Sequence, residues 1–416
     1  MRACLLAALL ALPPVAAQDA PPSLPFPGLL KQAEREAGNP LATYAAMLEQ
    51  EAQYRASPVF AQIYPEVRLN YEEFLGVPEA GVQAMSLPAL SSAPPAGEQA
   101  IPGGFAPVPA VDAIARAAAA TRLVIFGEEH HLPQTRCLYD ALLRRLWDLG
   151  YRWLAAETFA PEVMEDGFRV PDYHSGYYTM DPVFASAVRT ARELGYRLVA
   201  YDTSERGPPG DGSFRDRTQA QNLKRLVFDV DPGAKLLVFA GRGHAAEVPP
   251  ADGWTPMASV LKQITGIDPF TVFAPTMSER STREEEDPLY RYATAHGLVK
   301  EPVVFVSGDE RWIGSGNCDA YVFWPRVQLV DGRPDWMGSS MGRRRTAIPA
   351  ELQRGDGLRL VQAFLAGEPG SAVPVDQVLL RPGLPLPVLM LSSGTYWLRA
   401  LGAQAMVAGP VDAKVE

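Results

Sequence analysis

The sequence of this 416-residue chain predicts an α/β fold, with a central, mainly parallel sheet that has helices on both faces. Short apolar runs alternate with helical patterns between residues 110 and 275, as expected of successive βα units. The segments "LWDLGYRWLAAE" and "ARELGYRLVAYD" repeat one such unit, in which a helix end, a glycine, a strand and an acid follow one another. Hydrophobic residues make up 47% of the chain, which is enough to build a large core around this sheet.

The first 17 residues have the pattern of a secretory signal peptide. An arginine precedes an apolar run of about ten residues, and "VAA" supplies the small residues of a cleavage site after Ala17. We therefore expect an exported protein, either periplasmic or secreted. No later segment has the 18 uninterrupted apolar residues that indicate a membrane span.

The composition along the chain divides it into further regions. Residues 18–109 are expected to form a helical lead and a Pro/Gly-rich linker or surface strap, the latter at 86–109. Residues 110–345 are expected to form the α/β domain, with 276–345 as its extension. Residues 346–416 are β-rich and form either a small module or strands that pack on the core.

Within the α/β domain, apolar runs of strand length and glycine-terminated helical patterns predict the elements in order. The strands are expected at 122–126, 151–157, 196–202, 235–241 and 270–275. The helices are expected at 111–120, 134–150, 181–195, 214–230 and 257–266.

Charge and cysteine content narrow the classes of partner. The formal net charge of −10 argues against nucleic acid or an anionic membrane surface, so a small-molecule or peptide substrate is the expected partner. Export permits a disulfide between Cys137 and Cys318. A buried thiol in a helix is the simpler interpretation of Cys137, and the sequence leaves the pairing open.

Polar residues follow four of the predicted strands, at the point where each strand ends. They are the turn 127–131, Glu157, Asp202 and the turn 241–244. Because parallel strands share one carboxyl edge, these residues are expected to converge there. Asp202 alone is equally well explained as a helix cap or a turn residue, but four polar strand ends in succession predict a site.

The residue types at this edge suit the activation of water. Glycine allows a sharp turn, and a carboxylate beside a histidine can take a proton from water, with or without a metal. Two histidines and a carboxylate (His130, Glu157 and His244) would hold a divalent zinc, manganese or iron ion and leave one position open. Glu129 is expected to face solvent.

Two "GxxH" motifs, each directly after an apolar strand, resemble the superfamily that joins ChaN-like haem-uptake proteins, Tiki-type proteases and erythromycin-esterase-like hydrolases. The copies are "GEEH" (127–130) and "GRGH" (241–244). The resemblance covers about residues 105–275 and includes Glu157, the aspartate of "AYDTS", and "RDRTQAQNL" (215–223). The last of these is similar to an esterase-like "RDxxMAxN" helix, with Gln219 in the place of the usual methionine.

The resemblance implies a modified α/β fold and a water-activating site, and it implies roles for individual residues. The implied catalytic residues are Glu128, His130, Glu157 and His244. The implied substrate-binding residues are Arg215 or Arg217, which would orient or neutralise an anion, together with Asp202 and His131.

The doubled histidine satisfies two registers of this superfamily. The spacing of the ChaN-like and Tiki-like motif selects His130, and the esterase-like "GExxH" spacing selects His131. Adjacent side chains in an extended turn point apart, so both rarely enter one site. We favour His130 because the second motif has the same spacing, and we expect His130 to matter as much as His244.

Three functions from different classes remain open. The first is an exported hydrolase of an ester or peptide bond, with metal assistance as an option. The second is an uptake protein that binds haem or an iron compound, which needs an axial Tyr or His on an exposed, apolar-rimmed face. The third is a fold retained without catalysis that serves as a surface interaction protein. Loop 158–182 is a candidate lid, substrate wall or plain surface loop, and it offers Tyr173, Tyr177 and Tyr178 for the haem alternative.

Overall fold

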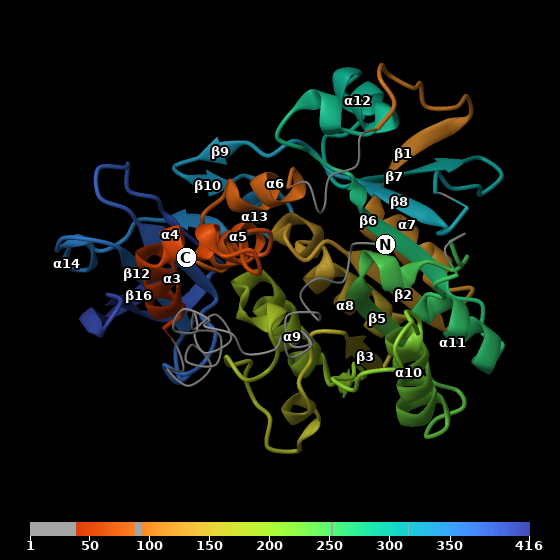
Figure 1. The fold of residues 1–416 in the computed structure, drawn as a ribbon, viewed down its shortest axis with the longest axis horizontal. Helices are drawn as coiled ribbons and strands as arrows, with labels where there is room; N and C mark the ends of the chain where they lie inside the picture. The colour runs from red at the N-terminus through yellow and green to blue at the C-terminus, as the bar shows by residue number, and fades with distance from the viewer. Residues whose placement is uncertain (1–38, 88–93, 251–252, 315) are drawn as a thin grey trace.

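The computed structural model describes residues 39–87, 94–250, 253–314 and 316–416, so the predicted signal peptide lies outside the described residues. The predicted α/β architecture is confirmed (Figure 1). Its centre is an eight-stranded sheet with the strand order β1-β7-β8-β6-β2-β5-β3-β4. The six strands from β8 to β4 in this order are parallel to one another, and β7 runs antiparallel between β8 and β1.

All five predicted strands are present in this sheet, where they form β2 to β6. The strands are β1 (Phe105–Pro109), β2 (Leu123–Glu128), β3 (Trp153–Ala156), β4 (Arg197–Ala200), β5 (Leu236–Gly241), β6 (Phe270–Met277), β7 (Val303–Ser307) and β8 (Ala320–Phe323). Every residue of β2, β3 and β5 is buried, as expected of strands that are covered on both faces.

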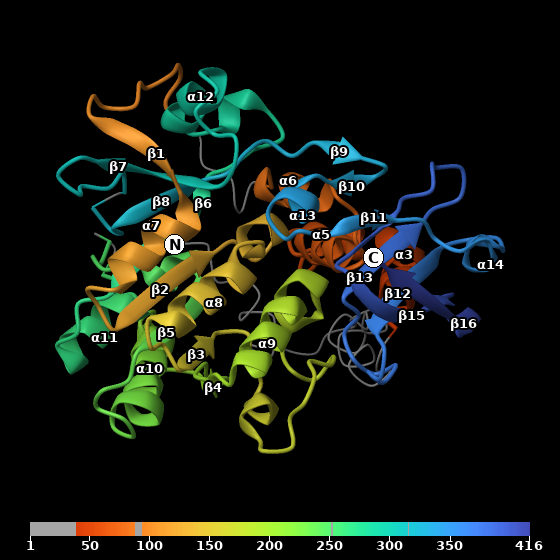
Figure 2. The ribbon, with the colours of Figure 1, turned by 180° about the vertical axis from the view of Figure 1, so that it is seen from behind.

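Helices cover both faces of the sheet (Figure 2). They are α7 (Ala110–Ala118), α8 (Tyr139–Asp148), α9 (Pro182–Leu194), α10 (Phe214–Leu223), α11 (Met257–Thr265) and α12 (Pro288–Ala295). One core cluster joins α7, α8 and α9 to one face, through residues such as Leu142 and Val188. A second cluster joins α10 and α11 to the other face, through Leu223 and Leu261.

Both ends of α9 have a residue type that favours a helix terminus. Gly195 closes α9 with a φ of 94°, a left-handed conformation that glycine adopts without a steric penalty. At its start, Asp181 caps α9 by accepting a hydrogen bond from the backbone of Val183. The predicted helix 214–230 is α10 followed by a π-helical turn at Lys224–Phe228.

The sheet also takes in residues on both sides of the region where the five strands were predicted. Residues 105–109, placed in the linker by sequence, form β1 and pair with β7. β7 and β8 join the same sheet, in agreement with 276–345 as an extension of it. Short elements then lead away from the sheet: β9 (Leu329–Val330), β10 (Arg333–Pro334), α13 (Trp336–Ser339) and β11 (Arg344–Thr346).

The two ends of the described chain pack against each other beside the sheet (Figure 1). The N-terminal helices are α3 (Pro40–Glu49), α4 (Glu51–Ala56), α5 (Tyr64–Phe74) and α6 (Ala80–Met85). The C-terminal elements are α14 (Ala350–Gln353), β12 (Arg359–Leu365), β13 (Asp376–Leu380), β14 (Leu389–Leu391), β15 (Gly394–Leu401) and β16 (Met406–Val415). β12, β13, β15 and β16 form an antiparallel sheet, and Leu360, Leu379 and Leu401 share a core with the helices.

Two further sequence expectations concern covalent links and membranes. Cys137 and Cys318 are both buried and no disulfide joins them, so the thiol interpretation of Cys137 holds and the alternative of a disulfide does not. In the part of the chain that the structure describes, no helix combines the length and the apolar character needed to cross a membrane.

Candidate functional site

The loops that follow β2, β3, β4 and β5 meet at one edge of the sheet, as the strand pattern predicts. These four strands are neighbours and parallel, so their carboxyl ends lie together. Glu128 ends β2, Glu157 directly follows β3, and Asp202 lies two residues beyond β4. His244 lies in the 3-10 turn Arg242–Ala245 after β5.

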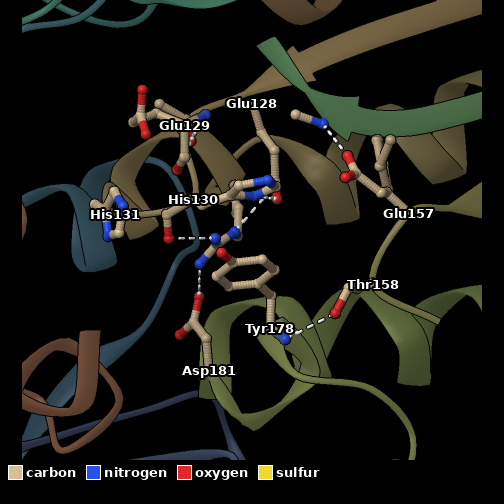
Figure 3. A network of polar contacts seen from close by, with 12 residues as sticks. Glu128, Glu129, His130, His131, Glu157, Thr158, Tyr178 and Asp181 are labelled. Carbon is tan, nitrogen blue, oxygen red and sulfur yellow. Dashed lines mark hydrogen bonds and ion pairs between the residues drawn. The ribbon is translucent and has the colours of Figure 1, made fainter. Parts of the chain in front are cut away.

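Glu128 and His130 form the first carboxylate–histidine pair of the site (Figure 3). His130 Nδ1 lies 3.0 Å from Glu128 Oε1. The other oxygen, Oε2, accepts hydrogen bonds from Arg136 Nε and the Tyr139 hydroxyl, both at 2.8 Å. Burial would raise the pKa of Glu128, but the charge of Arg136 and the bond to His130 outweigh it and lower this pKa to about 2. Glu128 is therefore an ionised carboxylate that orients the imidazole of His130.

His244 and Asp216 form a second pair of the same kind. His244 Nδ1 lies 2.6 Å from Asp216 Oδ1, which also accepts from the backbone of Met257. The other oxygen of Asp216 accepts from Trp254 Nε1 at 2.8 Å. Asp216 was not among the predicted site residues, although it lies inside the "RDRTQ" segment that carries the family resemblance.

Glu157 lies between the two histidines. Its Oε2 accepts a hydrogen bond from the backbone of Gly241 at 2.6 Å, and its Oε1 is 3.4 Å from His244 Nε2. A Cβ on residue 241 would lie 2.8 Å from His130 Nε2 and 3.1 Å from Glu157 Oε2, so only glycine leaves room for both groups here. Although burial opposes it, the charges of His244 and Arg215 hold the pKa of Glu157 well below its usual value.

Arg215 links the remaining acid of the edge to Glu157. Its Nη2 donates to Glu157 Oε1 and to Asp202 Oδ2, both at 2.6 Å, and its Nε donates to Asp202 Oδ1 at 2.9 Å. Its Nη1 lies 3.2 Å from His244 Nε2. Asp202 therefore belongs to the site. It does not cap the following helix, because the residue at the N-cap position of α10 is Ser213.

Three expectations about neighbouring residues are wrong. Arg217 pairs with Asp211 and does not reach Glu157, because it follows Arg215 by two positions on α10 and points elsewhere. Glu129 is buried rather than exposed, and the charge of Arg242, 3.4 Å away, lowers its pKa despite that burial. His131 is also buried and does not face the site (Figure 3).

His131 instead connects the turn 127–131 to the N-terminal helices. Its Nδ1 lies 2.6 Å from Asn70 Oδ1 and its Nε2 lies 3.2 Å from Glu66 Oε1, both on α5. The two ring nitrogens are thus engaged, which explains why His131 is unsuited to the predicted contact with substrate. His130 and His131 point apart, in agreement with the extended turn expected from the sequence.

Arg136 is the centre of a buried charge network beneath the site. Its side chain is fully buried and donates to Glu128, to Asp181 at 2.7 Å and to the carbonyl of His130 at 2.7 Å. Glu73 of α5 lies 3.5 Å from the same guanidinium. No sequence signal placed Arg136 or α5 at the site, because Asp181 and Glu73, two of the partners of Arg136, lie 45 and 63 residues from it along the chain.

Loop 158–182 forms a wall of the site. The ring of Tyr178 stacks on the ring of His130, with centroids 4.1 Å apart. Tyr173 is buried and its hydroxyl accepts from Gln362, while the hydroxyl of Tyr177 is sealed inside the protein. These tyrosines therefore do not supply the exposed face that the haem alternative requires, and His174 is the exposed ring of this loop.

The predicted metal ligands are close together but do not suit a metal in this arrangement. In the described part of the chain, no three His, Cys, Asp or Glu side chains form a group that would hold a metal ion. The physical reason is that the positively charged Arg215 contacts Glu157 Oε1 and His244 Nε2, where a metal ion would bind. The other oxygen of Glu157 accepts a hydrogen bond from the backbone of Gly241. We therefore derive no step of a reaction through a metal.

Removing this guanidinium is expected to create a metal site. In Arg215→Ala, Glu157, Asp202 and His244 lose their shared cation, and a Co²⁺ ion can take its place among oxygen and nitrogen ligands. Titration followed by visible absorption should show Co²⁺ binding at least about tenfold tighter than in the wild type. Arg217→Ala is the matched control, and equal affinity of wild type and Arg215→Ala would contradict the prediction.

Glu73 provides a test of the buried network through pH. Burial raises the pKa of Glu73 well above its usual 4.5, against the opposing charge of Arg136. Its contribution to stability is therefore complete below about pH 4.5 and is lost as the pH rises toward the folded value. At pH 7, Glu73→Gln should be more stable than the wild type and should unfold at a higher urea concentration. The gain in the free energy of unfolding is about 1.4 kcal/mol for each pH unit above 4.5 over which the folded protein retains the proton.

In the same urea experiment, Glu128→Gln should change the free energy of unfolding in the opposite direction to Glu73→Gln. The pKa of Glu128 is lowered to about 2, so its contribution to stability is present above about pH 4.5 and is lost as the pH falls through 2. We expect Glu128→Gln to be less stable than the wild type at pH 7, with a difference that shrinks toward acid pH. A Glu73→Gln variant that is destabilised at pH 7 as strongly as Glu128→Gln would contradict the raised pKa of Glu73.

Comparisons with known proteins add little to this geometry. No protein-family model and no curated protein sequence matches the chain. Two solved structures are weakly similar to it. The type III effector HopBA1 has a TM-score of 0.32 and 13% identity, over 54% of this chain and 99% of that one. ChaN of Campylobacter jejuni, described as binding haem cofacially, has a TM-score of 0.31 and 10% identity, over 46% of this chain and 97% of that one.

These scores are too low to carry an argument about function. The family resemblance of the two "GxxH" motifs therefore stays a prediction from the sequence.

Proposed function

We propose that this protein is an exported hydrolase of an uncharged ester or peptide bond, with His130 as the base that activates water. The observation that supports this best is the pairing of His130 with Glu128. Glu128 is almost sealed, with 4% of its side chain exposed, whereas 23% of the His130 side chain is exposed. Water and substrate can therefore reach the imidazole but not the carboxylate that orients it.

The proposed reaction uses the two ring nitrogens of His130 in different roles. With Nδ1–H donated to Glu128, the lone pair on Nε2 accepts a proton from water as the water oxygen attacks the carbonyl carbon. The imidazolium that forms is stabilised by the ionised carboxylates of Glu128 and Glu157. Nε2 then returns the proton to the leaving alkoxide or amine, and the base is regenerated.

The other residues of the site act by holding Glu157 in place. Arg215 and the Gly241 N–H each donate to one of its oxygens, and the Asp216–His244 pair packs beside it. His244 is buried, so we assign it a positioning role rather than a direct proton transfer.

The charges of the site favour an uncharged substrate. Glu157 and Asp202 already neutralise Arg215, the cation that the sequence offered to a substrate anion. Ionised Glu128 adds further negative charge at this edge. An anionic substrate would be repelled, whereas a neutral ester or amide would not.

A substrate panel tests the proposal directly. Purified protein is incubated with chromogenic esters and fluorogenic peptides, with and without EDTA. We expect hydrolysis above the buffer rate that survives the chelator, because no step uses a metal. Complete inactivity on both panels would reject the hydrolase.

The haem alternative is tested on the same protein. Haem is titrated in and the Soret band is followed in the wild type, in His174→Ala and in a Tyr173→Phe/Tyr177→Phe/Tyr178→Phe variant. If the protein hydrolyses no substrate of either panel and shows a stoichiometric Soret band, haem binding replaces hydrolysis as its proposed function. N-terminal sequencing of secreted material, with cleavage expected after Ala17, tests export.

A further inference from the structure

A pocket outside the proposed active site is lined by four arginines. Arg333, Arg343, Arg344 and Arg345 surround it at β10, α13 and β11. The pocket contains about 610 Å³ of space that protein atoms do not fill, part of it open to solvent. Such a concentration of guanidinium groups is unexpected in a chain with a net charge of −10. None of its lining residues takes part in the Glu128–His130 or Asp216–His244 pairs.

Arg343 is the most informative of these arginines because it is buried without a carboxylate partner. Only 7% of the residue is exposed, and its Nη1 donates to the carbonyl of Val375 at 2.8 Å. Across the described residues it forms no ion pair, and its Nε and Nη2 donate to no protein acceptor. Burial lowers the pKa of Arg343, against the charges of Asp376 and Asp140. A buried guanidinium in this state lacks the partner that normally offsets its desolvation.

The neighbouring buried acid is already used. Asp376 Oδ1 binds Arg333 Nη2 at 2.5 Å, and Asp376 Oδ2 accepts from the backbone of Met390 at 2.6 Å. Asp376 is therefore engaged by Arg333 and by the Met390 backbone. Among the described residues, neither Asp376 nor Asp140, whose charges act on Arg343, forms an ion pair with it.

Arg345 brings a further positive charge to the rim. It lines the same pocket as Arg343, two residues further along the chain, whereas Arg344 donates to the carbonyl of Glu416. The acid facing Arg345 is Asp331, 3.8 Å away, and both side chains are more than half exposed. Asp335 is the acid in the lining, and its Oδ1 accepts from the backbone of Gln328.

We propose that this pocket binds a compact oxyanion, namely the phosphate group of a small molecule, through Arg343 and Arg345. The planar fork of a guanidinium matches the oxygens of phosphate, and two such forks at one pocket can hold a single group. The bound anion supplies the charge that Asp376 does not supply to Arg343. This site is separate from the proposed hydrolase chemistry and does not depend on it.

Calorimetric titration of the full chain tests the proposal with inorganic phosphate and pyrophosphate in physiological salt. We expect one saturable site per chain. Arg343→Met should weaken it at least about tenfold and Arg345→Gln about threefold to tenfold, since charge-assisted bonds are lost. Arg311→Gln is the matched control, because that arginine is exposed and paired with Asp309 elsewhere on the surface.

The outcomes separate cleanly. If Arg343→Met loses its folded circular-dichroism spectrum, Arg345→Gln decides, because its side chain is half exposed and its loss leaves the core intact. Absence of saturable binding of both anions, or equal affinity of the wild type and Arg345→Gln, overturns the proposal. Acetate that binds as tightly as phosphate would assign a carboxylate ligand instead and overturn the choice of phosphate.

Discussion

His130→Ala is expected to lower the rate of ester or peptide hydrolysis by about 10²–10⁴-fold, the usual contribution of a general base. The physical reason is that one nitrogen of His130, the proposed base, is fixed by an ionised carboxylate while the ring remains reachable by water. The measurement is kcat on the best substrate of the panel. The free energy of unfolding should change little, because the ring is partly exposed and Glu128 keeps Arg136 and Tyr139 as hydrogen-bond partners.

His174→Ala is the matched control for this experiment. His174 is an exposed histidine of loop 158–182 and takes no part in either carboxylate–histidine pair. It should retain the wild-type rate. Equal rates of His130→Ala and the wild type would exclude His130 as the base even if the protein is a hydrolase.

Arg136→Met is expected to destabilise the protein by about 3–5 kcal/mol, the range for removing one partner of a buried ion pair. The change leaves the carboxylates of Glu128 and Asp181 without their shared cation, in a place that water does not reach. Methionine retains much of the side-chain volume, so the loss reflects charge more than packing. Urea unfolding monitored by circular dichroism, extrapolated to zero denaturant, measures the difference.

The control for Arg136 is an arginine whose ion pair is exposed. Arg145 pairs with Asp112 at 3.0 Å, with more than half of each side chain in solvent. Arg145→Met should change the free energy of unfolding by less than about 1 kcal/mol. If Arg136→Met is as mild as Arg145→Met, the buried network does not support the site in the way described.

Most of the site was accessible from sequence because it depends on strand ends. Glu128, Glu157, Asp202 and His244 each follow an apolar run, and the parallel direction of the strands brings such positions to one edge. The structure also explains the spacing shared by the two "GxxH" motifs. In each, the histidine three residues after the glycine directs its Nδ1 to a carboxylate, Glu128 for one and Asp216 for the other.

The errors concern side chains whose direction depends on distant partners. The sequence places Glu129 in solvent, because the residues next to it carry no information about Arg242. This arginine lies in the loop after β5 and pairs with Glu129 in the folded protein. Arg215 and Arg217 are similar in sequence, yet their two-residue separation on α10 sends one to Glu157 and the other to Asp211. The role of a helical charge is thus set by which face of the helix meets the site.

The sequence by itself determined the α/β class, the positions of the five central strands and the helices along the chain, and the edge at which the polar residues gather. These features depend on periodicity and on strand ends, which are properties of neighbouring residues. Only the tertiary structure decided that α5 places Asn70 against His131, 61 residues away, and that Arg136 joins Glu128 to Asp181. Such contacts arise from the packing of segments remote in sequence, and no local pattern encodes which remote surface a buried charge will meet.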